Sequence, residues 1–574
     1  MRLRTLATSG MVSAMVASLI ASPLPAQAAS PAIVSMIASA TCNTGSGYCF
    51  APSVITVPVG ASVTWTNTTS APHTATDDGG GWTTPTVTNS ATLTFSNPGT
   101  FTYHCAIHPD MHGTLLVGAT NAANVSTQQY SLSGSDGTTW KDIDPSHLGL
   151  SVTPAADSMA VLSAGADLWT ENAGYNQDLG INVNGSIAAW KESGGFAGTL
   201  SPNAAFVQTV FPMTGGTTYG IKLQWKANKS AGAAVIAAGA GPWPSGSGGF
   251  SPTSVTARLI PISAASLQTA VSAQQYQLPN SDGTSWQDLD ATNLALTVTP
   301  TANSVAIISG NADLWTTMAG FNQDLGIYLQ ESDSTQYPGN IVAWKESGGF
   351  AGTFSPNAAF VQTVLPLTAN TTYHLKLRWK TNKNTTNNGE VIVAGAGPWP
   401  SGSSTFSPTR LTVQLLPAGT NPATAVSTQQ YLLTNSDGTT WQDLDATNLG
   451  LTVTPATGCL AVISGNADLW TTQPGYNQDI GIYIQEANAT QYPGNIIAWK
   501  ESGGFAGTFS PNAAFVQAVF PMNGGTTYHV KLRWKTNKTT NNSGETIVAG
   551  AGPWPSSTTR FSPTRLTVQL LSCS

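Results

Sequence analysis

The chain has 574 residues, more than a single hydrophobic core usually organises, so we expect several domains. Only 9% of the residues are charged and the net charge is −7; because no basic cluster is present that would neutralise phosphates, nucleic acid is excluded as an expected partner. Thr, Ser, Asn, Gly and Pro are abundant and helical apolar periodicity is nearly absent, which predicts an all-β fold of short strands and turns.

The first residues have the pattern of a secretory signal peptide. A basic start at Arg2 and Arg4 precedes a short apolar run, and the small-residue site A-Q-A ends at Ala28. We expect residues 1–28 to be removed, which would change the net charge from −7 to −9. The apolar run is too short to span a bilayer, and no later segment is long enough. The predicted location is extracellular or at the cell surface, or the periplasm in a two-membrane cell.

A small β-domain is predicted over residues 40–118. Its expected strands are two around a turn, then a hairpin, then a closing strand: 53–60, 61–67, 91–95, 98–105 and 114–117. A sandwich of this kind carries its loops at the two ends. The loop at residues 71–74 is therefore expected beside the loop that follows residue 105.

The segment Y-H-C-A-I-H-P-D-M-H-G at residues 103–113 is the most informative stretch of the chain. It offers the thiolate of Cys105, the imidazole of His108 and the thioether of Met111 at the spacing C-x2-H-x2-M. The upstream segment A-P-H-T supplies a second imidazole, His73. A thiolate, two imidazoles and a thioether are the donors of a mononuclear copper site that transfers electrons.

These motifs, together with V-P-V-G-A-S-V-T-W-T-N and P-G-T-F-T-Y-H-C, resemble the cupredoxins, and most closely the amicyanin/plastocyanin group. The resemblance covers roughly residues 45–118. It implies a Greek-key β-sandwich and one type 1 copper ion that exchanges single electrons. By position, His73, Cys105 and His108 would be the equatorial ligands and Met111 the weak axial ligand. The resemblance also implies that His108 reaches the surface and serves as the edge through which electrons pass.

Four neighbouring residues bear on this interpretation. Thr74 stands where many family members have Asn, so we expect a weaker bond between the two ligand loops. Asp110 places a negative charge inside the ligand loop, which should favour the oxidised metal and disfavour anionic partners. His104 and His112 flank the ligands and are expected to be non-ligands, with His112 the substitute if Met111 did not coordinate. A Zn(II) site, a Cu(I)-only site and a buried free thiol at Cys105 are the alternatives.

The four remaining cysteines separate into two local pairs. Cys42 and Cys49 flank a short loop, and Cys459 and Cys573 both lie in the last part of the chain. We predict a disulfide within each pair, which fits an oxidising compartment. The alternative is that one or more of them are free thiols.

Beyond residue 125 the sequence repeats three times with a period near 150. Each copy contains S-D-G-T-[ST]-W, A-D-L-W-T, A-W-K-E-S-G-G-F-A-G-T and A-G-A-G-P-W-P-S. We expect three jelly-roll-like β-sandwich repeats, each with its own core, over residues 125–262, 272–417 and 426–574. Short linkers are expected near residues 121–127, 264–273 and 418–428. Copy one lacks about eight residues between Ile181 and Trp190, which predicts a length difference in a loop.

The repeats show no recurring nucleophile and base, so we predict no catalytic residues and no enzyme. His374 and His529 have Gly220 at the matching position, and His147 stands alone. Recurring carboxylates of the type used in glycoside hydrolysis are present, but triplication is more typical of a binding array. The carboxylates are Asp167, Asp313, Asp468, Asp178, Asp324, Asp479, Glu192, Glu346 and Glu501. Trp243, Trp399 and Trp554, set between prolines, are the candidates for stacking on cell-surface glycans; the alternative is that the tryptophans are structural.

The sequence therefore predicts an exported blue-copper protein that carries single electrons, with three repeats for display, anchoring or glycan binding. Its expected partner is a redox protein or a small-molecule electron donor or acceptor. A copper-dependent oxidase is disfavoured, because no second histidine-rich cluster accompanies the first. The alternative function is a surface adhesin or structural array whose copper domain only binds or handles copper.

Overall fold

The computed structural model describes twelve segments of the chain. They are residues 32–194, 200–241, 249–262, 266–333, 336–348, 357–397, 406–419, 422–488, 494–503, 512–541, 543–552 and 561–571. These segments form strands and one short 3-10 turn, Ala40–Cys42, which confirms the all-β class. Within them, no helix is long and apolar enough to cross a membrane. The predicted signal peptide, residues 1–28, lies outside the described residues.

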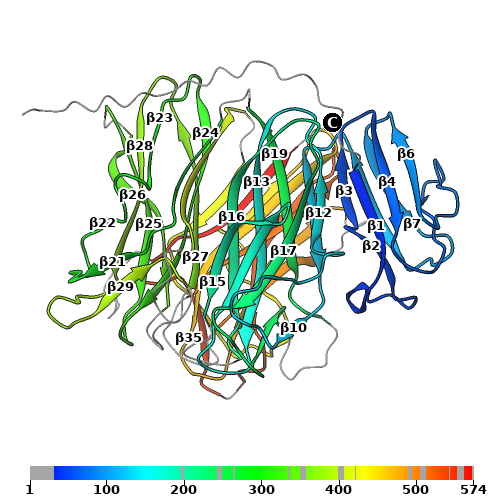
Figure 1. Cartoon of the computed structure of the whole chain (residues 1–574). Coiled ribbons are helices and arrows are strands. Elements are labelled where there is room, and N and C mark those ends of the chain that lie inside the picture. The colour runs from blue at the N-terminus through cyan, green and yellow to red at the C-terminus, as the bar shows by residue number, and fades with distance from the viewer. Residues whose placement is uncertain are drawn as a thin grey trace, which may run out of the picture.

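Two sheets form the first domain, drawn in blue in Figure 1. One sheet has the order β2-β1-β4-β6: Tyr48–Ala51, Ala32–Ala38, Ala61–Asn67 and Ser90–Phe95. The other contains β3-β8-β7-β5: Val54–Val57, His112–Val117, Gly99–His104 and Thr76–Asp77. Phe50, Trp65 and Tyr103 are fully buried between the sheets. Burial of three aromatic side chains supplies a large part of the hydrophobic stabilisation of so small a domain.

The predicted hairpin of residues 91–95 and 98–105 is wrong. β6 pairs with β4, whereas β7 pairs with β8 and β5 in the opposite sheet, so the chain crosses between the sheets near Pro98. The strands at 54–57 and 61–67 likewise belong to different sheets. Alternation of apolar and polar residues identifies a half-buried strand but does not identify its partner, which explains the error.

Each repeat is a pair of packed antiparallel sheets with the same strand order in all three copies. In repeat 1 the strands are β9 (Asn121–Ser126), β10 (Tyr130–Ser133), β11 (Lys141–Asp142), β12 (Gly149–Val152), β13 (Ser158–Thr170), β14 (Gln177–Val183), β15 (Ser186–Ser193), β16 (Asn203–Met213), β17 (Tyr219–Ala227), β18 (Val235–Ala238) and β19 (Thr253–Pro261). In repeat 2 they are β20 (Leu267–Ser272), β21 (Tyr276–Pro279), β22 (Gln287–Asp288), β23 (Ala295–Val298), β24 (Ser304–Thr316), β25 (Gln323–Glu331), β26 (Pro338–Ser347), β27 (Asn357–Leu367), β28 (Tyr373–Thr381), β29 (Val391–Ala394) and β30 (Thr409–Pro417). In repeat 3 they are β31 (Ala423–Ser427), β32 (Tyr431–Thr434), β33 (Gln442–Asp443), β34 (Gly450–Val453), β35 (Cys459–Thr471), β36 (Gln478–Glu486), β37 (Asn495–Ser502), β38 (Asn512–Met522), β39 (Tyr528–Thr536), β40 (Thr546–Ala549) and β41 (Thr564–Leu571).

Three segments expected to be linkers consist largely of strand. β9, β20 and β31 pair along the edges of β19, β30 and β41 in their own repeats. Their polar composition suggested linkers. A strand at the edge of a sheet is paired on one side only and is more exposed than a central strand, so it tolerates polar residues. The length difference between copies does map to a loop. Repeat 1 joins β14 to β15 through Asn184 and Gly185, both with positive φ, whereas repeat 2 continues to Glu331 before returning at Pro338.

The three repeats close around a common axis instead of forming a linear array (Figure 1). Phe206, Phe360 and Phe515 meet there with ring centroids 4.4–4.6 Å apart. The polar contacts run in one cyclic direction: the backbone N–H of Glu192 donates to Asp313, that of Glu346 to Asp468, and that of Glu501 to Asp167. Because the last contact returns from repeat 3 to repeat 1, the arrangement has approximate threefold symmetry.

Buried ionisable groups occupy each junction between repeats. Asp178 and Glu192 are opposite each other on β14 and β15, and Lys226 forms an ion pair with Asp178. Glu192 Oε2 and Asp178 Oδ1 find no donor among the described residues, and we infer that Glu192 holds a proton that satisfies both oxygens. Burial first, and then the charge of Asp178, raises the pKa of Glu192 well above its ordinary value. The recurring carboxylates therefore form buried junctions, not an open hydrolytic site.

The first domain joins repeat 1 by adding strands to its sheet. β3 pairs in parallel with β12, with Ser151 opposite Ile55, and this produces one sheet that runs from β15 to β5. The Asn124 side-chain amide donates to Ser53 Oγ and to the backbone oxygens of Ser146 and Gly149. Repeats 2 and 3 have alanine at the position of Asn124, so this contact is specific to the repeat that carries the first domain.

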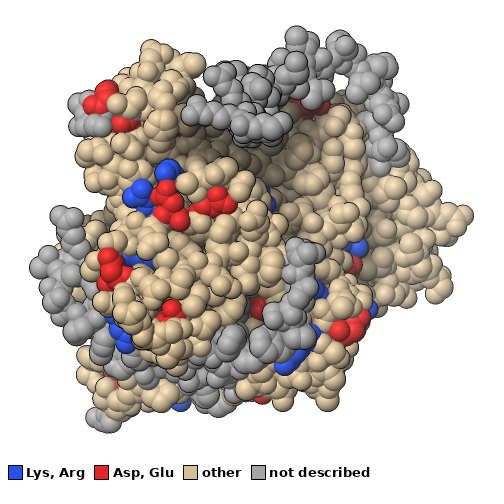
Figure 2. Space-filling model, turned by 60° about the vertical axis from the view of Figure 1, so that its left-hand side comes forward, with Lys and Arg blue, Asp and Glu red and all other residues tan. Residues whose placement is uncertain are grey.

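Charged side chains are sparse on the face shown in Figure 2, where basic and acidic groups adjoin each other. The ion pairs of the chain include those of repeat 2, where Lys376 and Arg378 both bind Asp288. Pairing of this kind leaves no continuous basic surface on that face, in keeping with the low charge of the chain.

Because these glutamates have raised pKa values, we predict that the stability of the repeats falls as the pH rises. A carboxyl group whose pKa is raised on folding stabilises the folded state below its ordinary pKa of 4.5. This contribution is lost as the pH rises through the pKa of the folded state. Replacing all three residues (Glu192→Gln, Glu346→Gln and Glu501→Gln) should flatten the decline in melting temperature between pH 5 and pH 8. It should also raise the melting temperature at pH 8. Exposed Glu171→Gln is the control, and an unchanged pH profile in the triple variant would contradict this account.

Asn124→Ala should loosen the junction between the first domain and repeat 1. Of the three hydrogen bonds that this side chain donates, only the one to Ser53 crosses the junction, so its loss should weaken the junction by about 1 kcal/mol. Hydrogen exchange should accelerate at the Thr153 amide, which donates to Thr56 across the junction. The β23 and β34 segments, which take no added strand in the described structure, serve as internal controls in the same sample. Unchanged exchange at Thr153 would show that backbone pairing alone holds the junction.

Candidate metal centre

Two loops at one end of the first domain carry the predicted ligands. His73 lies between β4 and β5, where its backbone N–H and C=O pair with those of Val87. Cys105 follows β7 directly, and a tight turn returns the chain to β8. In that turn the Met111 N–H donates to His108 O and the Cys105 N–H donates to Met111 O. These backbone hydrogen bonds hold both loops in place within the domain.

Three predicted donor atoms converge at this end of the domain. Cys105 Sγ lies 3.8 Å from His73 Nδ1 and 3.8 Å from His108 Nδ1, and the two nitrogens are 3.1 Å apart. His73, Cys105 and Met111 are fully buried, whereas His108 is half-buried. Donors that each bind one ion at about 2.0–2.3 Å are separated from one another by roughly 3–4 Å, so the spacing fits a single metal ion.

Neighbouring side chains fix the orientation of the two imidazoles. Thr69 Oγ1 lies 2.9 Å from His73 Nε2, which leaves Nδ1 directed at Cys105. The Tyr48 ring packs against His73 and His108, with centroid separations of 4.9 and 4.8 Å. Burial, together with the adjacent His108, lowers the pKa of His73 and so favours the neutral imidazole, the form that binds metal ions.

Thr74 joins the two ligand loops through two hydrogen bonds. Its backbone N–H donates to Cys105 Sγ at 3.3 Å, and its hydroxyl accepts the Ala106 N–H at 2.8 Å. The sequence led us to expect a weaker connection because Thr74 replaces Asn. The structure contains this connection, because the threonine hydroxyl reaches the backbone of the opposite loop.

A second connection fixes the far side of the ligand loop. The Asp110 carboxylate accepts the Ser46 N–H at 2.7 Å and the Ser46 hydroxyl at 2.8 Å. These bonds, the backbone donor first, hold the pKa of Asp110 below its usual range, so the carboxylate is ionised at neutral pH. Ser46 lies within the loop closed by the Cys42–Cys49 disulfide, which confirms the first predicted pair. The disulfide loop therefore braces the ligand loop.

The flanking histidines are directed elsewhere. His104 Nδ1 lies 2.6 Å from Asp78 Oδ1, and His112 is exposed with its ring 6.5 Å from that of His104. Neither belongs to the group formed by His73, Cys105 and His108. Sequence reasoning did not identify Ser46, Tyr48 or Thr69, because residues at strand ends and turns carry no motif that distinguishes a supporting role.

The remaining predicted site residues are distributed elsewhere. Cys459 begins β35, but Cys573 lies outside the described residues, as do Trp243, Trp399 and Trp554, so those predictions remain predictions. Other repeat tryptophans are structural: Trp225, Trp379 and Trp534 are buried in the three cores. The isolated histidines have local partners: His147 binds Asp144, His374 binds Thr297 and His529 binds Thr452.

Comparisons with solved structures find similarity to a small part of the chain. No family model and no curated protein sequence matches the chain. Among solved structures, an oxidised mutant of amicyanin is 28% identical, covers 15% of this chain and 81% of its own, and has a TM-score of 0.13. A purple cupredoxin from Nitrosopumilus maritimus is 29% identical, covers 15% of this chain and 98% of its own, and has a TM-score of 0.14. We therefore rest the functional argument on the geometry of the site.

Thr74→Val should weaken the connection between the two ligand loops. The valine keeps the shape and the N–H bond to Cys105 but removes the acceptor of the Ala106 N–H. Loss of about 1 kcal/mol should accelerate hydrogen exchange at Ala106 about fivefold. Thr64→Val is the matched control. It removes a hydroxyl that is hydrogen-bonded to Thr92 within the β2-β1-β4-β6 sheet, and it should leave hydrogen exchange at Ala106 unchanged. Unchanged exchange in Thr74→Val would mean that the hydroxyl contributes nothing to loop coupling.

Proposed function

We propose that the chain is a one-electron carrier that uses a single copper ion bound by His73, Cys105, His108 and Met111. The convergence of three donor atoms, all within 4.8 Å of one another, carries this proposal. A thiolate and imidazoles bind copper in both of its oxidation states, and a weak thioether bond adjusts the potential between them. The donor set therefore fits copper by type as well as by spacing.

The residues of the chain support this role in three ways. The Thr74 N–H donates to Cys105 Sγ and so stabilises negative charge on the thiolate. The bonds of Thr69, Thr74 and Ser46 hold the loops in one arrangement, so little reorganisation accompanies a change of charge. Burial of His73 and Cys105 excludes water from the donors. A bound copper ion would supply the redox change itself.

His108 is the edge through which we expect electrons to pass. It is half-buried, whereas His73 is fully buried, and its neighbour Ile107 is 43% exposed. A partner that approaches this end of the domain meets the imidazole edge before any other donor. The ionised Asp110 beside it disfavours anionic partners.

The repeats are proposed to be a rigid support for the redox domain in an exported protein. The sheet shared by β3 and β12 holds the domain against one repeat, and the three repeats brace each other around their axis. The Cys42–Cys49 disulfide supports export, because such bonds persist in oxidising compartments.

The closed arrangement of the three repeats also favours a second candidate function. The chain would then be a structural or adhesive surface protein whose first domain only binds copper.

Copper addition to the purified chain should produce an intense visible absorption band from thiolate-to-copper charge transfer. Cys105→Ser should abolish the band, because serine offers no thiolate. Ascorbate should bleach the wild-type band and reoxidation should restore it over repeated cycles. His104→Ala is the control that should leave the band intact.

Two results would contradict the electron-carrier function. A colourless chain that binds only Zn(II) or Cu(I) would indicate metal handling. A band that is lost irreversibly after one reduction would indicate a copper site without electron-transfer capacity, and would favour the structural or adhesive candidate.

A further inference from the structure

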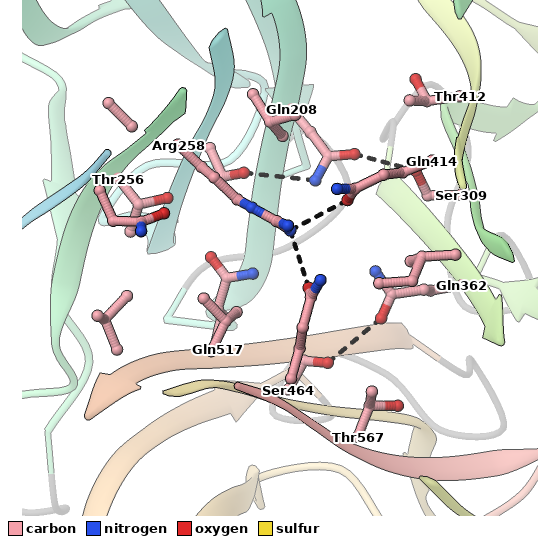
Figure 3. A pocket seen from close by; sticks show the side chains of 18 of the residues that line it. Gln208, Thr256, Arg258, Ser309, Gln362, Thr412, Gln414, Ser464, Gln517 and Thr567 are labelled. Atoms are coloured by element: carbon pink, nitrogen blue, oxygen red, sulfur yellow. Dashed lines mark hydrogen bonds between the residues drawn. The ribbon is translucent and has the colours of Figure 1, made fainter. Parts of the chain in front are cut away.

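A polar cavity lies where the three repeats meet (Figure 3). It has a volume of about 80 Å³, and its walls come from β13, β16 and β19 of repeat 1 and their counterparts in the other repeats. Gln208, Gln362 and Gln517 contribute one amide from each copy. The serine hydroxyls also cross between repeats, because Ser309 donates to Gln208 and Ser464 donates to Gln362. The cavity is thus a shared product of all three repeats.

One residue breaks the threefold pattern of the walls. Arg258 on β19 occupies the position that Gln414 holds on β30 and Gln569 on β41. Its Nη1 donates to the side-chain oxygens of Gln414 at 3.0 Å and Gln569 at 2.9 Å. Figure 3 shows the guanidinium of Arg258 reaching from repeat 1 toward Gln414. A single positive charge therefore sits among otherwise neutral side chains.

The charge of Arg258 has no counter-ion in the described structure. The residues that line the cavity include no carboxylate, and none of the ion pairs among the described residues involves Arg258. Burial lowers the pKa of Arg258 to about 10, so the group is still charged at neutral pH. A guanidinium has five N–H donors, and only the Nη1 donors bind the two glutamines. Arg258 is half-buried, so its charge is partly removed from water, and an anion that binds its unused donors would offset that cost.

We propose that this cavity binds a small inorganic anion, either a halide or a planar oxyanion such as nitrate. The cavity is large enough for a small ion and a few waters. Because the oxygens of Gln414 and Gln569 accept from Arg258, their amide N–H groups are left as further donors for an anion.

The anion would also link the three repeats electrostatically. Arg258 comes from repeat 1, whereas the glutamine donors come from repeats 2 and 3. Neutralising the half-buried charge of Arg258 would offset the cost of its desolvation and favour the closed arrangement. This role is independent of the metal centre, which lies in the first domain.

Isothermal titration with sodium nitrate, in a buffer that contains no halide or other small anion, tests this proposal. The full wild-type chain should bind one nitrate, and Arg258→Gln should lower the affinity at least tenfold. That variant installs the residue present in repeats 2 and 3, so it is expected to fold. Lys222→Gln removes an exposed positive charge elsewhere and should leave nitrate binding unchanged.

A crystal of the wild-type chain grown in sodium bromide provides a test that requires no variant. An anomalous bromide peak beside Arg258 would support the proposal, and a cavity with no peak would overturn it. Equal nitrate binding by wild type and Arg258→Gln would also overturn it. If Arg258→Gln lowers stability but wild type binds no anion, Arg258 is only a cross-link between repeats and the proposal fails.

Discussion

The metal centre depends on two loops being held together by the protein itself. His73 and Cys105 are far apart in sequence, and the hydrogen bonds of Thr74 connect the loop of one directly to the loop of the other. Thr69 and Ser46 then fix the imidazole of His73 and the far side of the ligand loop. A donor set arranged in this way changes little when the charge of a bound ion changes. Low reorganisation is the physical requirement for fast electron transfer, and under the proposed function the loop contacts would provide it.

The same principle of mutual bracing extends to the rest of the chain. The first domain shares a sheet with repeat 1, and repeat 1 contacts both other repeats around the axis. Buried groups such as Glu192, Lys226 and Arg258 sit at these junctions, where each needs a partner from another element. Buried polar groups of this kind add little net stability, but they disfavour arrangements in which their partners are missing. We infer that they select the closed form over an extended array.

Local sequence patterns predicted the parts of the structure that depend on local spacing. The order of donors in C-x2-H-x2-M, the strand alternation and the triplication are all readable along the chain, and Cys42–Cys49 followed from proximity. Patterns failed where the structure depends on distant partners. The partner of β6, the pairing of β9 with β19, and the closure at Phe206 arise from long-range contacts that periodicity does not encode. The recurring carboxylates illustrate the same limit: the sequence disfavoured a hydrolytic role for them, but it did not indicate that they lie buried between repeats.

The most direct test of the central claim is X-ray absorption at the copper edge of the loaded chain in its oxidised and reduced forms. We predict two nitrogen neighbours and one short sulfur neighbour in both forms, with metal–ligand distances that differ little between them. A first shell without a short sulfur would contradict the assignment of Cys105. A large change in distances on reduction would contradict the claim that the loops are held rigidly for electron transfer.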